Sequence, residues 1–180
     1  MALILVTGLP GTGKSVLAKE LVRFLPIKPI YLSTDNVRRK LFNFSDHQYR
    51  EFGKDYYSPQ NRKLVYSAIN MIVDILIGHN LSLVVDGTFY SQETRKPLLE
   101  ISNKYNCKLI VIKTTCSEET VKKRMKDRKL EEKEISDAGF DIYLEIKKRF
   151  EPITVQHLVV NTEKDLKINL QEVGNYIEKF

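Results

Sequence analysis

A glycine-rich octapeptide near the start of the chain carries a lysine and a serine at its end. Residues 8–15 read GLPGTGKS and fit the pattern G-x-x-x-x-G-K-[ST] without a gap. Glycines at this spacing let backbone N–H groups approach phosphate oxygens, because no Cβ stands in the way. A helix that begins at this loop adds unpaired N–H donors and a partial positive charge. The pattern therefore predicts a phosphate-binding loop.

The residues of this loop have separate expected tasks. We expect Lys14 to reach the β- and γ-phosphates of a nucleotide and the hydroxyl of Ser15 to bind Mg²⁺. The predicted nucleotide-binding residues are Gly8, Pro10, Gly11, Thr12, Gly13, Lys14 and Ser15. An ordinary glycine-rich turn with a solvated lysine is the alternative, and the surrounding elements decide between the two.

Those elements have the order that a phosphate-binding loop requires. Residues 2–6 are a short apolar run, typical of a buried strand. After the loop, Leu17, Leu21 and Phe24 recur at helical spacing, and Pro26 closes the segment. Strand, glycine loop and helix follow one another directly, which favours the phosphate-binding interpretation.

Two further acidic residues each follow a predicted strand. Asp86 ends the apolar run 81–85, where its carboxylate could hold Mg²⁺ or a water of Mg²⁺ beside Ser15. Asp35 follows the predicted strand 30–33, and ligands of open α/β sheets bind outside such strand ends. Asp35 could orient a substrate hydroxyl and accept its proton. The alternatives are a turn or helix-capping role for either aspartate.

Arginines complete the set of residues with chemical potential. Arg38 lies one helical turn after Asp35 and could clamp an anionic group or neutralise charge in a transition state. Arg124 and Arg128 share one face of a predicted basic helix that begins at Ser117. A solvated cationic face explains that helix equally well. The aromatic and basic residues between 42 and 57 could stack nucleobases, although packing of a small helical cap explains them better.

The alternation of elements predicts an α/β fold with a five-stranded parallel sheet and helices on both faces. The other predicted strands cover residues 30–33, 81–85, 108–113 and 157–160. Predicted helices cover 61–77, 91–105, 136–149 and 166–177, with Pro97 a possible break in the second. We expect residues 1–180 to form one domain, with polar, mobile residues at 130–135.

Composition and charge bear on the substrate, the state of the cysteines and the cell compartment. The chain has 180 residues and a net charge of +6, which is compatible with an anionic substrate. Cys107 and Cys116 are too few for a disulfide framework or a metal site, so we expect reduced thiols. There is no basic leader and no apolar run of membrane-spanning length, so we expect a cytoplasmic protein that does not engage a membrane.

Several of these segments together resemble one group of P-loop kinases. The loop 8–15, the pair Asp35-x-x-Arg38, the triplet 86–88 and the later basic helix are similar to the group that includes phage polynucleotide 5′-kinase. Zeta-toxin and chloramphenicol phosphotransferase kinases are more distant relatives. The nearest resemblance is to predicted-kinase domains, on Tyr-Ser-Pro at 57–59, Asp-Gly-Thr-Phe at 86–89 and Phe-Glu-Pro at 150–152.

The resemblance implies phosphorylation of a hydroxyl group with ATP and Mg²⁺. It implies that Asp35 is the base and that the strand of Asp86 neighbours the phosphate-loop strand. It also implies a helical lid at about 117–150, from which Arg124 and Arg128 close over the phosphates. It names no acceptor, which could be a small molecule or a nucleic-acid end, and it implies no obligate protein partner. A nucleotide-hydrolysing switch and a non-catalytic ATP-binding module are the alternatives. Residues 161–165 do not form the guanine motif of a GTPase, and a non-catalytic module has no use for Asp35.

Overall fold

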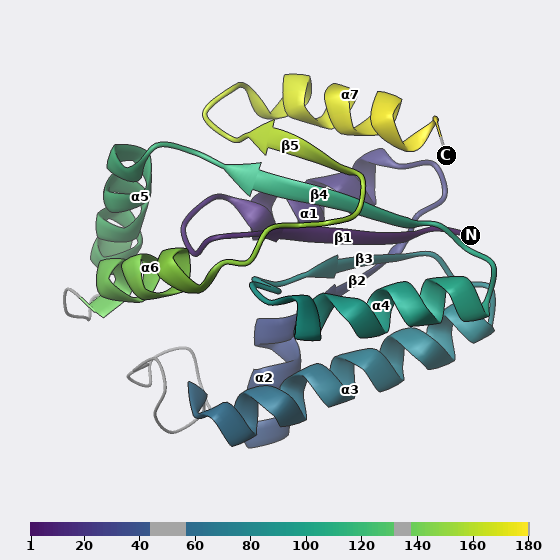
Figure 1. Cartoon of the computed structure of the whole chain (residues 1–180). Coiled ribbons are helices and arrows are strands. Elements are labelled where there is room, and N and C mark those ends of the chain that lie inside the picture. Colours follow the sequence, from purple (N-terminus) through teal and green to yellow (C-terminus); the bar gives the residue numbers. More distant parts are fainter. Residues whose placement is uncertain (44–56, 132–137, 180) are drawn as a thin grey trace.

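The structure is a computed structural model that describes residues 1–43, 57–131 and 138–179 (Figure 1). The strands are β1 (Leu3–Gly8), β2 (Ile30–Ser33), β3 (Leu83–Asp86), β4 (Leu109–Thr115) and β5 (His157–Asn161). The helices are α1 (Lys14–Phe24), α2 (Thr34–Phe42), α3 (Pro59–Gly78), α4 (Gln92–Lys104), α5 (Glu118–Glu131), α6 (Ala138–Arg149) and α7 (Leu166–Ile177).

The five strands form one sheet in the order β2-β3-β1-β4-β5, and each neighbouring pair is parallel. This confirms the predicted α/β fold. The phosphate-loop strand β1 lies between β3 and β4, so the strand that ends in Asp86 is its direct neighbour. In the register, Val6 of β1 faces Asp86, and Asp86 faces Ser33 at the end of β2. The chain therefore leaves these three strands at one edge of the sheet.

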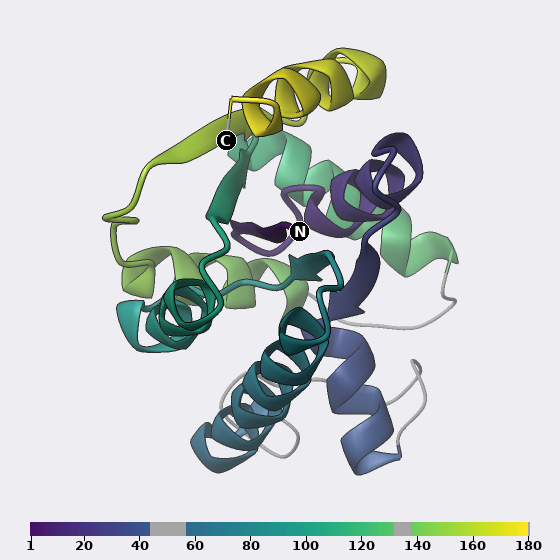
Figure 2. The ribbon, with the colours of Figure 1, turned by 90° about the vertical axis from the view of Figure 1, so that its right-hand side faces the viewer.

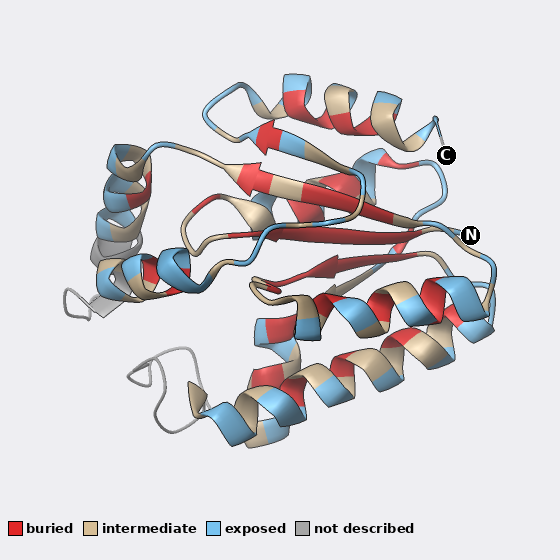
Figure 3. Ribbon diagram, in the orientation of Figure 1, coloured by how far each residue is buried: buried red, intermediate tan, exposed pale blue. Residues whose placement is uncertain are grey.

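The strands are apolar on both sides because helices cover both faces of the sheet. Figure 2 shows α1 and α7 on one face and α3 and α4 on the other. All residues of β1 and β3 are buried, and the helices bury the stripe that faces the sheet (Figure 3). We name the cluster under α1 and α7 the α1-face cluster; it includes Ile4, Val6, Leu17, Leu21, Val84 and Val173.

The predicted elements are confirmed with small shifts at their ends. Helix α3 begins at Pro59, where the hydroxyl of Ser58 accepts a hydrogen bond from the backbone of Asn61. Helix α4 runs through Pro97 without a break, because its buried face, which includes Leu98 and Ile101, packs against the sheet and the neighbouring α3. Tertiary packing thus outweighs the local preference of proline.

Helices α5 and α6 lie beyond the strand ends that carry the loop, in the region predicted as a lid (Figure 1). The side chain of Arg128, most of the aromatic and basic residues of 42–57 and most of the segment 130–135 lie outside the described residues. Among the helices that the structure describes, none is long and apolar enough to cross a membrane.

Candidate functional site

The loop between β1 and α1 is held by hydrogen bonds within its own backbone and side chains. The carbonyl oxygen of Leu9 accepts from the hydroxyl of Thr12 at 2.7 Å and from Nζ of Lys14 at 2.8 Å. The Thr12 hydroxyl also pairs with the hydroxyl of Thr114 on β4 at 2.8 Å. These contacts fix the loop to the neighbouring strand and place the ammonium group of Lys14 inside its curve.

Gly13 shows why this loop needs glycine. It precedes α1 in the left-handed conformation, with φ of 80°, which disfavours any residue with a Cβ. A Cβ there would also stand 3.3 Å from Nη1 of Arg124 and from the hydroxyl of Thr162. Without it, the first turn of α1 is open to an anion, as expected for a phosphate cradle.

The predicted metal-binding residue Asp86 is buried at the end of β3. Its side chain is reached by Tyr31 of β2, whose hydroxyl donates to Oδ2 of Asp86 at 2.7 Å. Burial, together with the charge of Asp86, raises the pKa of Tyr31, while the neighbouring hydroxyls of Ser33 and Ser15 oppose that rise. Ser15, Tyr31 and Asp86 therefore lie together, although they come from three elements.

This group fits a magnesium ion held mainly by phosphates and water. Mg²⁺ in nucleotide sites takes one or two protein oxygens and keeps several waters. The hydroxyl of Ser15 and the carboxylate of Asp86 are hard oxygen donors of that kind. In the part of the chain that the structure describes, no group of three or more His, Cys, Asp or Glu side chains could hold a metal ion by itself.

Asp35 and Arg38 form an ion pair in the first two turns of α2. Nη1 of Arg38 donates to Oδ1 of Asp35 at 2.6 Å. Arg38 is buried, whereas the side chain of Asp35 is 54% exposed. Asp35 is not the N-cap of α2, because that position belongs to Ser33. The capping alternative for Asp35 is therefore not what the structure shows.

One tyrosine ring contacts the guanidinium group of Arg38, and a second tyrosine lies near it. The ring of Tyr57 lies 4.3 Å from its central carbon, a distance typical of a cation–π contact. Tyr66 of α3 lies close enough for its pKa to respond to both Arg38 and Asp35, and burial raises that pKa to about 12. Nε of Arg38 is buried, and none of the residues that the structure describes offers it a hydrogen-bond acceptor. A buried donor without a partner costs free energy, which a bound acceptor oxygen could recover.

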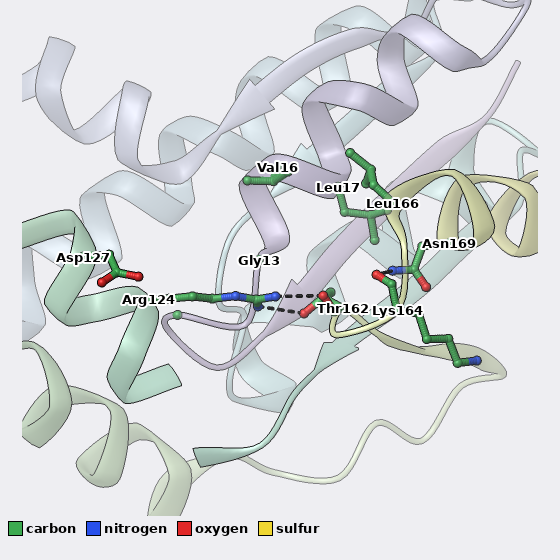
Figure 4. Close-up of a pocket in the computed structure, with 10 residues that line it drawn as sticks. Gly13, Val16, Leu17, Arg124, Asp127, Thr162, Lys164, Leu166 and Asn169 are labelled. Atoms are coloured by element: carbon green, nitrogen blue, oxygen red, sulfur yellow. Dashed lines mark hydrogen bonds between the residues drawn. The ribbon is translucent and has the colours of Figure 1, made fainter. Parts of the chain in front are cut away.

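Arg124 of α5 reaches the other end of the phosphate loop. Its two Nη atoms donate to the hydroxyl of Thr162 at 2.9 Å and to the Thr162 carbonyl at 2.7 Å. The Thr162 hydroxyl donates in turn to the carbonyl of Thr12 at 2.9 Å. Thr162 thus ties the helix that carries Arg124 to the phosphate loop. Figure 4 shows the two hydrogen bonds between Arg124 and Thr162.

A cavity of about 420 Å³ opens beside this contact. Apolar side chains from α1 and α7 form part of its wall, and the guanidinium group of Arg124 faces the loop glycines (Figure 4). The lining residues are Gly11, Gly13, Val16, Leu17, Arg124, Asp127, Thr162, Lys164, Leu166 and Asn169. Its size and its mixture of apolar walls with few polar groups suit a planar base next to the phosphates.

The helix α5 also packs directly on the loop. Val121 is fully buried, and a Cβ on Gly11 would come within 2.9 Å of its Cγ1 and 3.1 Å of Met125 Cε. A side chain at position 11 would push the helix away, so this glycine permits the close approach. The predicted lid is therefore in contact with the predicted phosphate site.

Glu163 anchors the start of α5 to the loop after β5. Its carboxylate accepts from the hydroxyls of Ser117 and Thr120, and these bonds lower its pKa to about 2. A carboxyl group with a lowered pKa in the folded state contributes stability above its unfolded pKa, and this contribution is lost as pH falls toward 2.

We therefore expect the melting temperature of Glu163→Gln to be lower than that of the wild type at pH 7, and this difference to narrow at pH 3. Thermal unfolding followed by circular dichroism at both pH values measures it. Glu178→Gln, at an exposed residue after α7, is the matched control and should show no such narrowing. A difference that stays constant with pH would contradict this role of Glu163.

Arg95 is an arginine that holds two segments of the chain together. It is buried in α4 and donates to the carbonyl oxygens of Phe89, Glu151 and Pro152. Arg95 thus connects the segment after Asp86 with the segment after α6, and its guanidinium group is occupied by backbone oxygens.

Comparison with known proteins assigns the chain that carries this site to a family. The sequence matches the AAA domain family (AAA_33) over residues 3–153, which contain the phosphate loop, Asp35, Asp86 and α5. The chain belongs to this family. The match ends before Thr162 and the C-terminal helix α7, so those parts of the cavity wall lie outside the matched segment.

Solved structures share the fold of this AAA-family domain over nearly its whole length. The APS kinase CysC of Mycobacterium tuberculosis, solved with AMPPNP and APS, has a TM-score of 0.69 at 18% identity, covering 98% of this chain and 97% of that chain. A gluconokinase of Sinorhizobium meliloti has a TM-score of 0.66 at 15% identity, covering 99% and 98%. Kti12 of Chaetomium thermophilum, solved with ADP-AlF3, has a TM-score of 0.69 at 18% identity, covering 96% and 97%. The fold is therefore that of P-loop kinases.

Tyr31 and Thr162 were not found from the sequence, and Tyr57 was indicated only as one of the aromatic residues between 42 and 57. Tyr31 lies in the middle of a strand, Thr162 follows one, and Tyr57 stands in an aromatic-rich stretch without a helical period. Their side chains meet the site only through pairing of strands or packing of helices that are distant in sequence. Position immediately after β5, at the same sheet edge as the other site residues, is the one signal that could have indicated Thr162.

Proposed function

We propose that this protein transfers the γ-phosphoryl group of ATP to a hydroxyl group of an acceptor, with Mg²⁺. The observation that carries the proposal is the place of the Asp35–Arg38 pair. It follows β2 at the same sheet edge as the phosphate loop and Asp86, so a carboxylate that can accept a proton stands on the phosphate side of the sheet. ATP binding alone would not need this pair.

The proposed reaction assigns one task to each group. Backbone N–H groups of the loop and the ammonium group of Lys14 hold the phosphates. Asp35 accepts the proton of the acceptor hydroxyl while the oxygen of that hydroxyl forms a bond to the γ-phosphorus. At the same time the bond between the γ-phosphorus and the β–γ bridging oxygen breaks, and ADP leaves with that oxygen. Ser15 and Asp86 would hold Mg²⁺, which would supply positive charge that stabilises the phosphate oxygens during transfer.

Arg38 has the position of a residue that binds acceptor or transition-state charge. Its buried guanidinium group contacts Asp35 and the ring of Tyr57, and Nε has no hydrogen-bond partner among the described residues. Arg124 and Arg128 belong to the proposed lid, and Arg124 in addition borders the cavity proposed for the base of ATP. Within the family, we propose membership of the predicted-kinase and polynucleotide 5′-kinase-like group.

The decisive experiment measures ADP formation from ATP with and without acceptors. Nucleosides, oligonucleotide 5′-ends, sugars and aminoglycosides cover the acceptor classes of such kinases. Turnover that depends on an acceptor and yields a phosphorylated product supports the proposal. Hydrolysis without acceptor dependence would favour a nucleotide switch, and binding of ATP without any turnover would favour a non-catalytic module.

We expect Arg124→Ala to lower the affinity for ATP by about 10- to 100-fold, because a hydrogen bond to a charged group contributes about 1.5–3 kcal/mol and the cavity loses one wall. Titration calorimetry with AMPPNP measures the affinity. The fold loss in this affinity should exceed any fold loss in kcat. Lys123→Ala removes a charge from the neighbouring exposed position of α5 and is the matched control. Equal, small effects of both variants would show that the basic face of α5 is only a solvated surface.

A further inference from the structure

The hydrogen bond between Tyr31 and Asp86 joins the predicted metal site to a residue outside every motif of the sequence. The phenolic hydroxyl lies 2.7 Å from Oδ2 of Asp86, which is 2% exposed. A buried carboxylate is stable only if its oxygens have partners. Tyr31 supplies a neutral donor, so it satisfies one oxygen of Asp86 without cancelling its negative charge.

The register of the sheet explains how these two side chains meet. Tyr31 pairs with Val84, and Ser33 pairs with Asp86 two residues further along. Because side chains alternate between the faces of a sheet, Tyr31, Val84 and Asp86 all lie on the face that α1 covers. The long side chain of Tyr31 thus runs diagonally across β3 to the carboxylate.

The first turn of α1 lies over the same place. The hydroxyl of Ser15 is near enough to Tyr31 to influence its pKa. Ser15, the Tyr31 hydroxyl and Asp86 are therefore neighbours on one face of the sheet, at the edge where the phosphate loop begins. A carboxylate has about four lone-pair positions, and the Tyr31 bond leaves those of Oδ1 for another ligand.

We propose that Tyr31 is a positioning residue of the magnesium site, whose hydroxyl fixes the Asp86 carboxylate in the orientation that meets Mg²⁺ or one of its waters. The proposal rests on the nucleotide and Mg²⁺ binding of the proposed function. Outer partners that orient a metal-binding group typically change metal affinity or activity 10- to 100-fold when removed.

Space filling is the competing explanation for Tyr31. Its ring packs against the α1-face cluster. Tyr31→Phe keeps the ring and removes only the hydroxyl, so it separates the two roles. Tyr176→Phe removes a hydroxyl from another tyrosine that packs on the same cluster, far along the chain on α7, and is the matched control.

The experiment measures the affinity for AMPPNP by titration calorimetry at a series of Mg²⁺ concentrations. For Tyr31→Phe, the Mg²⁺ concentration that gives half of the Mg²⁺-dependent increase in AMPPNP affinity should be about tenfold higher than for the wild type. The AMPPNP affinity in EDTA should stay within about twofold of the wild type. Tyr176→Phe should match the wild type. In an Asp86→Asn background, adding Tyr31→Phe should change the Mg²⁺ dependence no further, because the group that Tyr31 positions is already altered.

Other outcomes overturn the proposal. A Mg²⁺ dependence of Tyr31→Phe equal to that of the wild type would mean that the ring alone matters. Tighter Mg²⁺ binding would mean that the hydroxyl competes with the ion for Asp86. An equal loss of AMPPNP affinity with and without Mg²⁺ would indicate a disturbed fold. Because binding is measured and not turnover, a failure to find an acceptor defeats the proposed function but leaves this test intact.

Discussion

Lys14→Ala is expected to lower the rate of phosphoryl transfer by about 10²–10³-fold, the usual effect of removing one preorganised electrostatic group, and to weaken ATP binding as well. Lys14 is the one side chain of the loop whose charge lies inside the curve, where its Nζ is 2.8 Å from the carbonyl oxygen of Leu9. Its positive charge would face the β- and γ-phosphates in both the bound state and the transition state. Both KM and kcat should therefore change.

The measurement is a steady-state assay of ADP formation, together with AMPPNP titration. Lys19→Ala, at an exposed position of the same helix, removes an equal charge five residues further along and should behave as the wild type. Thermal unfolding of both variants shows whether the fold is intact. A Lys14→Ala variant with wild-type turnover would contradict the proposed phosphate-binding role of residues 8–15.

Asp35→Asn is expected to lower kcat by about 10²–10⁴-fold, the usual effect of losing a general base, with ATP affinity within a few-fold of the wild type. Asparagine keeps the shape of the side chain and can still accept the bond from Arg38, but it cannot take a proton. The distinction matters because Asp35 also forms an ion pair with the buried Arg38. A purely structural role for Asp35 would show as lost stability.

Rate and stability are therefore measured on the same preparations. Asp74→Asn is the control, because Asp74 of α3 also pairs with a basic residue, Lys104, away from the loop. Both variants lose one ion pair with a partly exposed carboxylate. The Asp74 pair has an exposed lysine and should contribute little to stability, whereas loss of the Asp35 charge leaves the buried Arg38 without its ionic partner. A drop in melting temperature with unchanged kcat in Asp35→Asn would assign Asp35 to structure and end its role as base.

Much of the architecture follows from local sequence. Apolar runs bounded by turn residues predict the five strands, and their alternation with helices predicts a parallel sheet. The phosphate loop could also be predicted from local sequence, because its function depends on backbone N–H groups that glycine and the start of a helix supply locally. Positions of Asp35 and Asp86 could be predicted as well, since Asp86 lies at the end of one strand, Asp35 lies two residues after another, and parallel strands end at one edge.

Contacts between distant segments could not be predicted in this way. The Arg124–Thr162 hydrogen bonds join residues 38 positions apart, and the Tyr31–Asp86 bond joins residues 55 apart. Pro97 shows the reverse case, in which local sequence suggests a break and packing of α4 prevents it. Each of these features depends on which elements become neighbours after folding.

The sequence by itself determined the kind of fold, the phosphate loop and the acidic residues at the strand ends, because these depend on residues adjacent in the chain. Only the tertiary structure decided that Asp86 is reached by Tyr31, that Arg38 is buried against Tyr57, and that α5 packs on Gly11. Strand order and register set these contacts, and they arise from burying both faces of the sheet at once.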